Sequence, residues 1–317
     1  MKITMINRKP AIQVSKLTKR YGQLLAVDHI SFSVENGEFF GFLGPNGAGK
    51  TTTARMLTGV LSAEEGKASI VGHPAGSLAA KQITGVVPEM ANAYADLSAW
   101  DNLILVADLY GIKKRKAAER AVSLLEELGL TKRKDDPVKA YSKGMKQRLI
   151  LCSAMVSDPE VLFLDEPTSG LDVQSARLIK GLLRRLNEKG KTIFLTTHDM
   201  DEANDLCHRV AVINKGKLVA VDAPEKLRMA TSAMHSVVVS FDKAVDSREL
   251  ENLPGVIAVS KEGDKFRLQT SNPGELATTL INRLCSKDLR IVSLNTLAPS
   301  LEDAFVALIG KEDQNAR

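Results

Sequence analysis

One short stretch of this chain restricts its fold more than any other, because it has the pattern of a phosphate-binding loop. The pattern G-x-x-x-x-G-K-[ST] is met at each fixed position, by Gly44, Gly49, Lys50 and Thr51. The glycines let the backbone curl so that successive N–H groups point at phosphate oxygens. The lysine can reach the β- and γ-phosphates, and the threonine hydroxyl can ligate Mg²⁺. The loop therefore predicts a nucleotide ligand.

The residues around the loop favour the same interpretation over a chance run of glycines. Residues 39–43 form an apolar run typical of a buried strand, and residues 52–57 have a helical pattern. The positive N-terminal end of that helix would face the phosphates. From residue 12 to about 224, short apolar strands alternate with helical segments, which predicts an α/β fold with a largely parallel sheet.

Length and composition bound the class of protein. The 317 residues suffice for two domains, and the apolar and charged fractions of 44% and 26% are those of a soluble globular protein. No apolar run approaches the roughly 20 residues that span a bilayer, and residues 1–10 lack a signal-peptide core. We therefore expect a cytoplasmic protein whose membrane association comes through a partner. The net charge of +5 permits nucleic-acid contact without requiring it.

The three cysteines show no metal-binding or redox spacing. Cys152, Cys207 and Cys285 lie far apart, without C-x-x-C. This argues against zinc and against a disulfide framework, and it fits a reducing compartment. We expect them to be small core residues.

The chain divides into two predicted domains. Residues 1–226 form the α/β core, and a mostly helical subdomain is inserted at about 91–157. There, Ala118, Ala121, Val122, Leu125 and Leu128 recur at helical spacing and predict one buried face. Residues 227–317 have the order β-α-β-β-α-β followed by one more helix, which resembles the split βαβ arrangement and predicts a small ferredoxin-like α+β domain. It lacks a nucleophile, a metal cluster or a glycine-rich loop, so we interpret it as a regulatory or docking domain.

Two adjacent acids follow a second buried strand. The strand at 161–164 delivers Asp165 and Glu166 to its carboxyl end, where ligands bind in open α/β sheets. Asp165 is placed to hold Mg²⁺, and Glu166 to activate the attacking water as a general base. Because neighbouring side chains on a strand point to opposite sides, the two acids should have different partners.

Three further positions extend the candidate site. Ser142 precedes a predicted helix and can cap its N-terminus, which leaves N–H groups and a positive dipole facing outward. His198 follows the strand at 192–197 and could hydrogen-bond a γ-phosphate while holding Glu166 and the water in line. Tyr21 precedes the phosphate loop and could stack on adenine. Each has a simpler interpretation: an ordinary helix cap, a loop histidine and a strand tyrosine.

Together these segments resemble the ATP-binding subunit of ABC transporters over about residues 12–226. The resemblance rests on GPNGAGKTT from Gly44, YSKGMKQR from Tyr141, FLDEPTSGLD from Phe163 and TTHDMDEA from Thr196. It implies an ATPase with ATP and Mg²⁺ as cofactors and with two catalytic residues, Glu166 and His198. The implied nucleotide contacts are Tyr21, Gly44, Pro45, Asn46, Gly47, Ala48, Gly49, Lys50, Thr51, Thr52, Ser142, Gly144 and Asp172, and the implied metal contacts are Thr51, Glu89 and Asp165.

Two positions depart from the family's commonest pattern. The signature is usually LSGGQ, whereas this chain has Tyr141-Ser142-Lys143-Gly144-Met145, which retains the serine and second glycine that contact phosphate. Glu89 stands where the family usually has glutamine. Either Glu89 ligates Mg²⁺ directly, or the neighbouring carboxylates favour its protonated form.

The signature variant and the appended domain, which ends near Pro299-Ser300-Leu301-Glu302-Asp303-Ala304-Phe305, resemble the drug-exporter branch that includes daunorubicin-resistance ATPases. That resemblance implies a second copy of the chain in an ATP-dependent homodimer and a separate membrane permease. It also implies a place on the inner face of the membrane and no nucleic-acid partner. The helical segment after Glu89 would contact the permease, with Tyr94, Leu97 and Trp100 as candidates for contact or for core packing.

Two alternatives remain open. A soluble ABC ATPase that acts on nucleic acid or ribosomes usually carries two cores or long coiled coils, and this chain has one core and no sustained heptads. A regulatory module with little hydrolysis is favoured only by Glu89. The transported molecule contacts the permease in such machines, so the substrate and the direction of transport do not follow from these residues.

Overall fold

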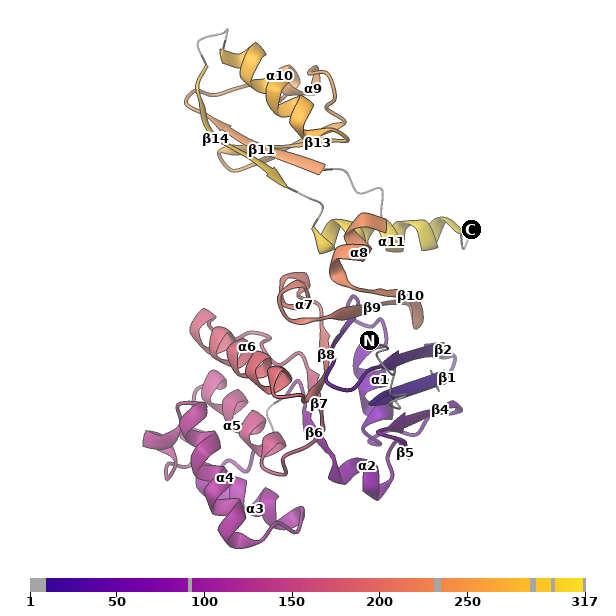
Figure 1. Ribbon diagram of the computed structural model, residues 1–317, viewed down its shortest axis with the longest axis vertical. Helices are drawn as coiled ribbons and strands as arrows, with labels where there is room; N and C mark the ends of the chain where they lie inside the picture. The colour runs from indigo at the N-terminus through magenta and orange to yellow at the C-terminus, as the bar shows by residue number, and fades with distance from the viewer. Residues whose placement is uncertain (1–9, 91–92, 231–234, 286–288, 298–299, 316–317) are drawn as a thin grey trace, which may run out of the picture. The chain divides into compact units, whose positions relative to one another are not determined.

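The computed structural model describes residues 10–90, 93–230, 235–285, 289–297 and 300–315 (Figure 1). The chain forms two compact units, Met1–Pro224 and Glu225–Arg317. Each unit has its own sheet and its own hydrophobic core, so each is described by itself.

A six-stranded sheet forms the centre of the first unit, and it confirms the predicted α/β class. Its order is β10-β9-β3-β8-β7-β6, and all neighbours pair in parallel except the antiparallel edge strand β10. Every residue of β3 and β8 is buried, as expected for parallel strands covered on both faces. The strands are β3 (Phe39–Leu43), β6 (Thr84–Val87), β7 (Val161–Asp165), β8 (Thr192–Thr197), β9 (Arg209–Asn214) and β10 (Lys217–Asp222).

A second, antiparallel sheet packs over helix α1 (Lys50–Leu57). Its order is β2-β1-β4-β5, with β1 (Ile12–Tyr21), β2 (Leu24–Val34), β4 (Glu65–Ile70) and β5 (His73–Pro74). Inward residues of β1 and β2 join residues of α1, β3, β7 and β8 in one core. Helix α1 therefore lies against both sheets, which fixes the loop that precedes it.

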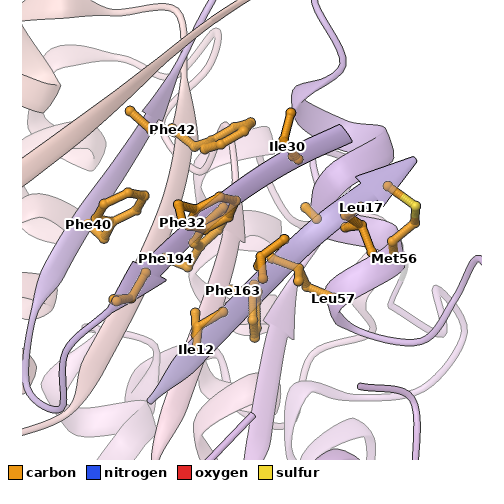
Figure 2. Close-up of a cluster of buried hydrophobic side chains, with 14 of the residues drawn as sticks. Ile12, Leu17, Ile30, Phe32, Phe40, Phe42, Met56, Leu57, Phe163 and Phe194 are labelled. Atoms are coloured by element: carbon orange, nitrogen blue, oxygen red, sulfur yellow. The ribbon is translucent and has the colours of Figure 1, made fainter. Parts of the chain in front are cut away.

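A stack of aromatic rings fills the middle of this core. The Phe194 ring lies 5.3 Å from that of Phe163, 5.5 Å from Phe42, 5.9 Å from Phe40 and 6.1 Å from Phe32, centroid to centroid (Figure 2). Such offset contacts add to the free energy gained from burying the rings. Phe194 is on β8, between the strands that lead to the candidate site, so the stack locks those strands together.

The helical subdomain predicted at about residues 91–157 is present. Residues 91 and 92, at its start, lie outside the described residues. It contains α3 (Ala99–Leu109), α4 (Lys114–Glu127) and α5 (Lys143–Met155), with short 3₁₀ turns η1 (Thr131–Arg133) and η2 (Val138–Ala140). The remaining helices of the unit are α2 (Leu78–Gln82), α6 (Val173–Glu188) and α7 (Met200–Leu206).

The predicted buried face of α4 was wrong in part. Val122 is 51% exposed, whereas Ala117 and Leu124 are buried beside the predicted Ala121 and Leu125. The apolar residues of α4 fit two overlapping faces of the helix. Packing against α3 and α5 buries the face that contains Ala117 and Leu124. Gly129 has a φ of +64° just after the helix, the left-handed conformation in which glycine commonly ends a helix.

The second unit has the predicted order of elements. After α8 (Pro224–Ala230) come β11 (His235–Phe241), α9 (Ser247–Glu251), β12 (Ala258–Glu262), β13 (Lys265–Thr270), α10 (Pro273–Cys285), β14 (Ile291–Leu297) and α11 (Leu301–Asn315). The antiparallel sheet order β12-β13-β11-β14 places the first strand in the centre, as in the split βαβ arrangement. Val237, Val239, Leu268, Leu276 and Leu280 form the middle of a separate core.

The cysteines bear out the sequence analysis as far as the structure describes them. Cys152 and Cys207 are free and buried, and burial raises the pKa of both thiols. The side chain of Cys285 lies outside the described residues. Neither described cysteine is therefore poised as a nucleophile.

The aromatic stack yields a prediction about stability. Phe194→Ala should lower the free energy of unfolding of the first unit by about 3–5 kcal/mol, because it deletes a fully buried ring and leaves a cavity. Urea unfolding followed by circular dichroism measures the change. Leu109→Ala, at a position 75% exposed, is the control and should shift the curve little. Equal shifts for both variants would show that the stack does not hold the unit together.

Candidate nucleotide site

The phosphate loop lies between β3 and α1, where the backbone tolerates only glycine at two positions. A Cβ on Gly44 would lie 2.4 Å from the carbonyl oxygen of Ile213, and one on Gly49 would lie 2.5 Å from that of Ala26. Gly49 also has a φ of +110°, which side-chain-bearing residues rarely adopt. Pro45, Asn46 and Gly47 form the exposed tip of the loop, Ala48 is buried, and Thr51 and Thr52 are half-buried.

The Lys50 side chain lies along the inside of this loop. Its Nζ donates hydrogen bonds to the carbonyl oxygens of Gly44, at 2.7 Å, and Pro45, at 3.3 Å. It also lies 3.6 Å from Oε1 of Glu166. The side chain is only 5% exposed, so these groups replace the water that a lysine normally binds. The loop thus holds one buried positive charge.

Asp165 shares its surroundings with the other two predicted metal contacts. The Thr51 hydroxyl donates to Asp165 Oδ1 at 3.3 Å, and the Thr196 hydroxyl donates to the same oxygen. Glu89, which is exposed, lines a cavity of about 260 Å³ together with Asp165. Among the described residues, no three histidine, cysteine or acidic side chains come together so that they could hold a metal ion by themselves. Two carboxylates and a hydroxyl fit Mg²⁺, which takes few protein ligands and binds the phosphates as well.

Glu166 has different partners from Asp165, as predicted, although the cause differs from strand alternation. Glu166 is the first residue after β7, and its φ of +48° turns the backbone into the left-handed region. Its Oε2 lies 2.9 Å from Nδ1 of His198, and its Oε1 faces Lys50. Non-glycine residues in this conformation are strained and cluster at functional sites. The structure therefore places a carboxylate between a lysine and a half-exposed imidazole.

Ser142, Gly144 and Asp172 form a second cluster, at the N-termini of α5 and α6. The Ser142 hydroxyl accepts from the Met145 N–H at 3.3 Å, which confirms the predicted cap. Asp172 caps α6 by accepting from the Ser175 N–H at 2.9 Å, and this bond holds the pKa of Asp172 below its usual value. A Cβ on Gly144 would lie 2.5 Å from Ser175 Oγ, so glycine allows the two helix ends to meet.

Tyr21 is the last residue of β1. It pairs with Leu24 across a tight turn, and 47% of it is exposed. The Nζ of Lys19 lies 5.8 Å from the centre of its ring. The ring face is thus available for stacking, and it is not part of the core.

Glu202 is a residue that the sequence analysis passed over. It stands three residues after Asp199, the N-cap of α7, in a pattern that predicts an exposed capping-box glutamate. The structure instead buries it fully, with Oε1 accepting from the Thr168 hydroxyl at 2.8 Å. Burial raises the pKa of Glu202, and the bond from Thr168 partly opposes this. Only the fold reveals that a carboxyl lies behind the site.

Comparison with known proteins identifies the family. Residues 27–169 match the model of ABC transporter ATP-binding domains, and residues 223–309 match the C-terminal domain of DrrA1-3-like ATP-binding proteins. The chain is 39% identical to Nod factor export ATP-binding protein I of Burkholderia pseudomallei, over 95% of this chain and 97% of that protein. The chain belongs to the ATP-binding subunits of ABC transporters.

Further relatives agree with this assignment. Linearmycin resistance ATP-binding protein LnrL of Bacillus subtilis is 33% identical over 95% of this chain and 98% of its own length. A solved ATP-binding subunit of an ABC transporter matches with a TM-score of 0.65 and 27% identity, covering 69% of this chain and 92% of that one. This ABC subunit is therefore an ATPase. In the part of the chain that the structure describes, no helix has both the length and the apolarity to cross a bilayer.

The buried carboxyl yields a prediction about pH. The folded protein holds the Glu202 proton more tightly than the unfolded chain, whose glutamates titrate near 4.5. This residue's contribution to stability should therefore fall as the pH rises above that value. The Glu202→Gln variant cannot lose a proton at this position. The midpoint of thermal unfolding of the variant, minus that of the unmodified protein, should therefore increase from about pH 5 to about pH 8. A constant difference between the two midpoints over that range would show that Glu202 titrates normally.

Proposed function

We propose that two copies of this ATPase subunit close around two ATP molecules and thereby drive export through a separate permease. The observation that carries this proposal is the separation of the two clusters. Helix α1 packs on β2, β4, β7 and β8, whereas α5 packs on α3, α4, β6 and α6, and the two helices lie on opposite sides of β6 to β8 (Figure 1). One nucleotide at the phosphate loop would thus meet the signature residues of a second copy.

The first cluster would bind and orient the nucleotide. Lys50 would exchange its bonds to loop carbonyls for the β- and γ-phosphates, while the N–H groups of Gly47 to Thr52 surround the phosphate oxygens. Tyr21 would stack on the adenine. Ser142 and Gly144 of the second copy would place the N-terminus of their α5 against the γ-phosphate. Asp172 would contact the other copy and so couple the two nucleotide sites.

Mg²⁺ would be held by Thr51 and Asp165, with Glu89 at the edge of the same cavity. When bound, it neutralises charge that develops on the phosphates. Glu89 would supply a carboxylate oxygen where the family usually has an amide.

Hydrolysis would depend on Glu166 and His198. The Glu166 carboxylate would accept a proton from water as that water attacks the γ-phosphorus and the bond to the β-phosphate breaks. The imidazole, 2.9 Å from the carboxylate, would hold Glu166 and the phosphate in line. Closure around ATP and opening after hydrolysis would shift the population of the dimer's closed state.

Export is supported by the names of the two relatives, Nod factor export and linearmycin resistance. The subunit would act on the cytoplasmic face of the membrane, held there by its permease. The side chains of Tyr94 and Leu97 are 60% and 36% exposed, so they are available for that contact. Trp100 is half-buried, with Lys134 over its ring. The domain at 227–317 would regulate or dock the subunit.

The roles of the two clusters yield one prediction. Glu166→Gln should lower the rate of ATP hydrolysis by about 10²-fold or more while ATP binding persists, because the base is lost and the phosphate contacts remain. The variant should therefore form a stable dimer with ATP, as measured by gel filtration with light scattering.

Lys50→Ala in the Glu166→Gln background is the matched control, because it removes a phosphate contact and should leave the protein monomeric. A Glu166→Gln variant that stays monomeric in saturating ATP would overturn the proposed closure. A variant that hydrolyses ATP at the original rate would overturn the role of Glu166.

The permease partner yields a second prediction. A tagged subunit pulled down from its native membranes in mild detergent should carry a multi-span membrane protein in stoichiometric amount, identified by mass spectrometry. Recovery from the soluble fraction with ribosomes or nucleic acid, and with no membrane protein, would favour the soluble ABC ATPase instead.

A further inference from the structure

Two segments that carry proposed catalytic residues are joined by a second link behind the site. The loop after β7 carries Glu166 and runs to Asp172, and the segment after β8 carries His198 and continues into α7. The first contact joins Glu166 and His198. The second, the Thr168–Glu202 link, is the hydrogen bond that the Thr168 hydroxyl donates to Glu202 Oε1 at 2.8 Å. Both contacts join the same two segments.

The Glu202 end of this link is rigid. The Glu202 N–H donates to Asp199 Oδ1 at 3.0 Å, and the Asp199 N–H donates to the Thr197 hydroxyl at 3.0 Å. Glu202 is therefore tied to the last residue of β8, directly before His198. Its side chain is fully buried, which leaves it little freedom to move.

The Thr168 end of the link controls the loop. The Ser169 N–H donates to the Glu166 carbonyl at 3.1 Å, and the Leu171 N–H donates to the Thr168 carbonyl at 3.2 Å. These turns make the loop a compact unit around Thr168. An anchor at Thr168 therefore also fixes the strained backbone of Glu166, which persists only where its surroundings hold it.

We propose that Glu202 is a positioning residue that acts through Thr168 to hold the loop bearing Glu166 in register with His198. This positioning role rests on the proposed function, in which Glu166 and His198 are the catalytic residues. Glu202 itself lies behind the site and touches no reacting atom.

A second observation separates this role from ordinary packing. Within the described residues, Glu202 Oε2 makes no hydrogen bond of normal geometry although it is buried, and the Thr197 hydroxyl, like that of Thr168, opposes the rise in the pKa of this carboxyl. A buried polar atom without a partner costs free energy, and an apolar residue would fill the space more cheaply. Lys180, Asp199 and Cys207 are the titratable groups that interact with the carboxyl electrostatically. In this proposal the role of Glu202 depends only on Oε1, which accepts the hydrogen bond from Thr168. The uncharged amide of a glutamine at position 202 should accept the same bond.

The test measures kcat and KM for ATP on full-length variants, together with their thermal unfolding. Thr168→Val removes the donor and should lower kcat about tenfold or more, with KM within about threefold of the unmodified value, since positioning acts on the reacting geometry. Thr168→Ser keeps the donor and Glu202→Gln keeps the acceptor, so both should stay within about threefold in kcat. Glu202→Met removes the acceptor and should match Thr168→Val.

The controls separate positioning from stability. Thr168 is half-buried, so its replacement should leave the protein folded. Thr279→Val is the matched control, since it deletes a hydroxyl that donates to the Glu275 carbonyl in the second unit. If kcat of Thr168→Val falls only in proportion to the folded fraction, the link is structural and the proposal is wrong.

Two further outcomes would also overturn the proposal. One is unaltered turnover by Thr168→Val. The other is a loss by Glu202→Gln as large as that by Glu202→Met, which would show that the charge matters and the hydrogen bond does not. Glu166→Gln serves as the reference. If it hydrolyses ATP normally, the role proposed above for Glu166 fails, whereas if it is inactive and Thr168→Val is normal, only the role of Glu202 fails.

Discussion

The parallel register of three neighbouring strands is the constraint on which the site depends. Leu43 pairs with Thr197, and Asp165 pairs with Thr196, so β3, β7 and β8 end at the same level. The phosphate loop follows β3, His198 follows β8, and Asp165 is the last residue of β7 with Glu166 directly after it, so the register brings these groups together. The strands are buried on both faces, and a slip of one residue would move the Phe194 ring to the opposite face of the sheet and break the aromatic stack.

Within that frame, the site is balanced by a small number of polar contacts. Lys50 is almost fully buried, and two loop carbonyls and one carboxylate compensate it. Asp165 faces hydroxyl groups, whereas Glu166 faces a lysine and an imidazole, so two adjacent acids have different surroundings. In the proposed mechanism, this difference would allow one acid to bind a metal and the other to activate a water molecule, because a carboxylate's partners set its chemistry.

The arrangement of helices supports the proposal that one copy of the chain would hold only half of each composite site. Gly144 and Asp172 meet where the N-termini of α5 and α6 converge, and α5 belongs to a subdomain that packs against the edge strand β6. The second unit has its own core around Val237 and Leu268, and it shares no part of the phosphate loop. The residues of the candidate nucleotide site therefore all belong to the first unit.

The sequence by itself determined the phosphate loop, the buried strands and the order of strands and helices in the second unit. Each of these depends on local residue types and on the spacing of apolar residues. It did not determine which stripe of α4 is buried, since Val122 and Leu124 fitted overlapping patterns. The left-handed turn at Glu166 and the bond between Thr168 and Glu202 were also decided by tertiary structure. That bond joins residues 34 apart in the chain, and only the register of β7 and β8 brings them within reach.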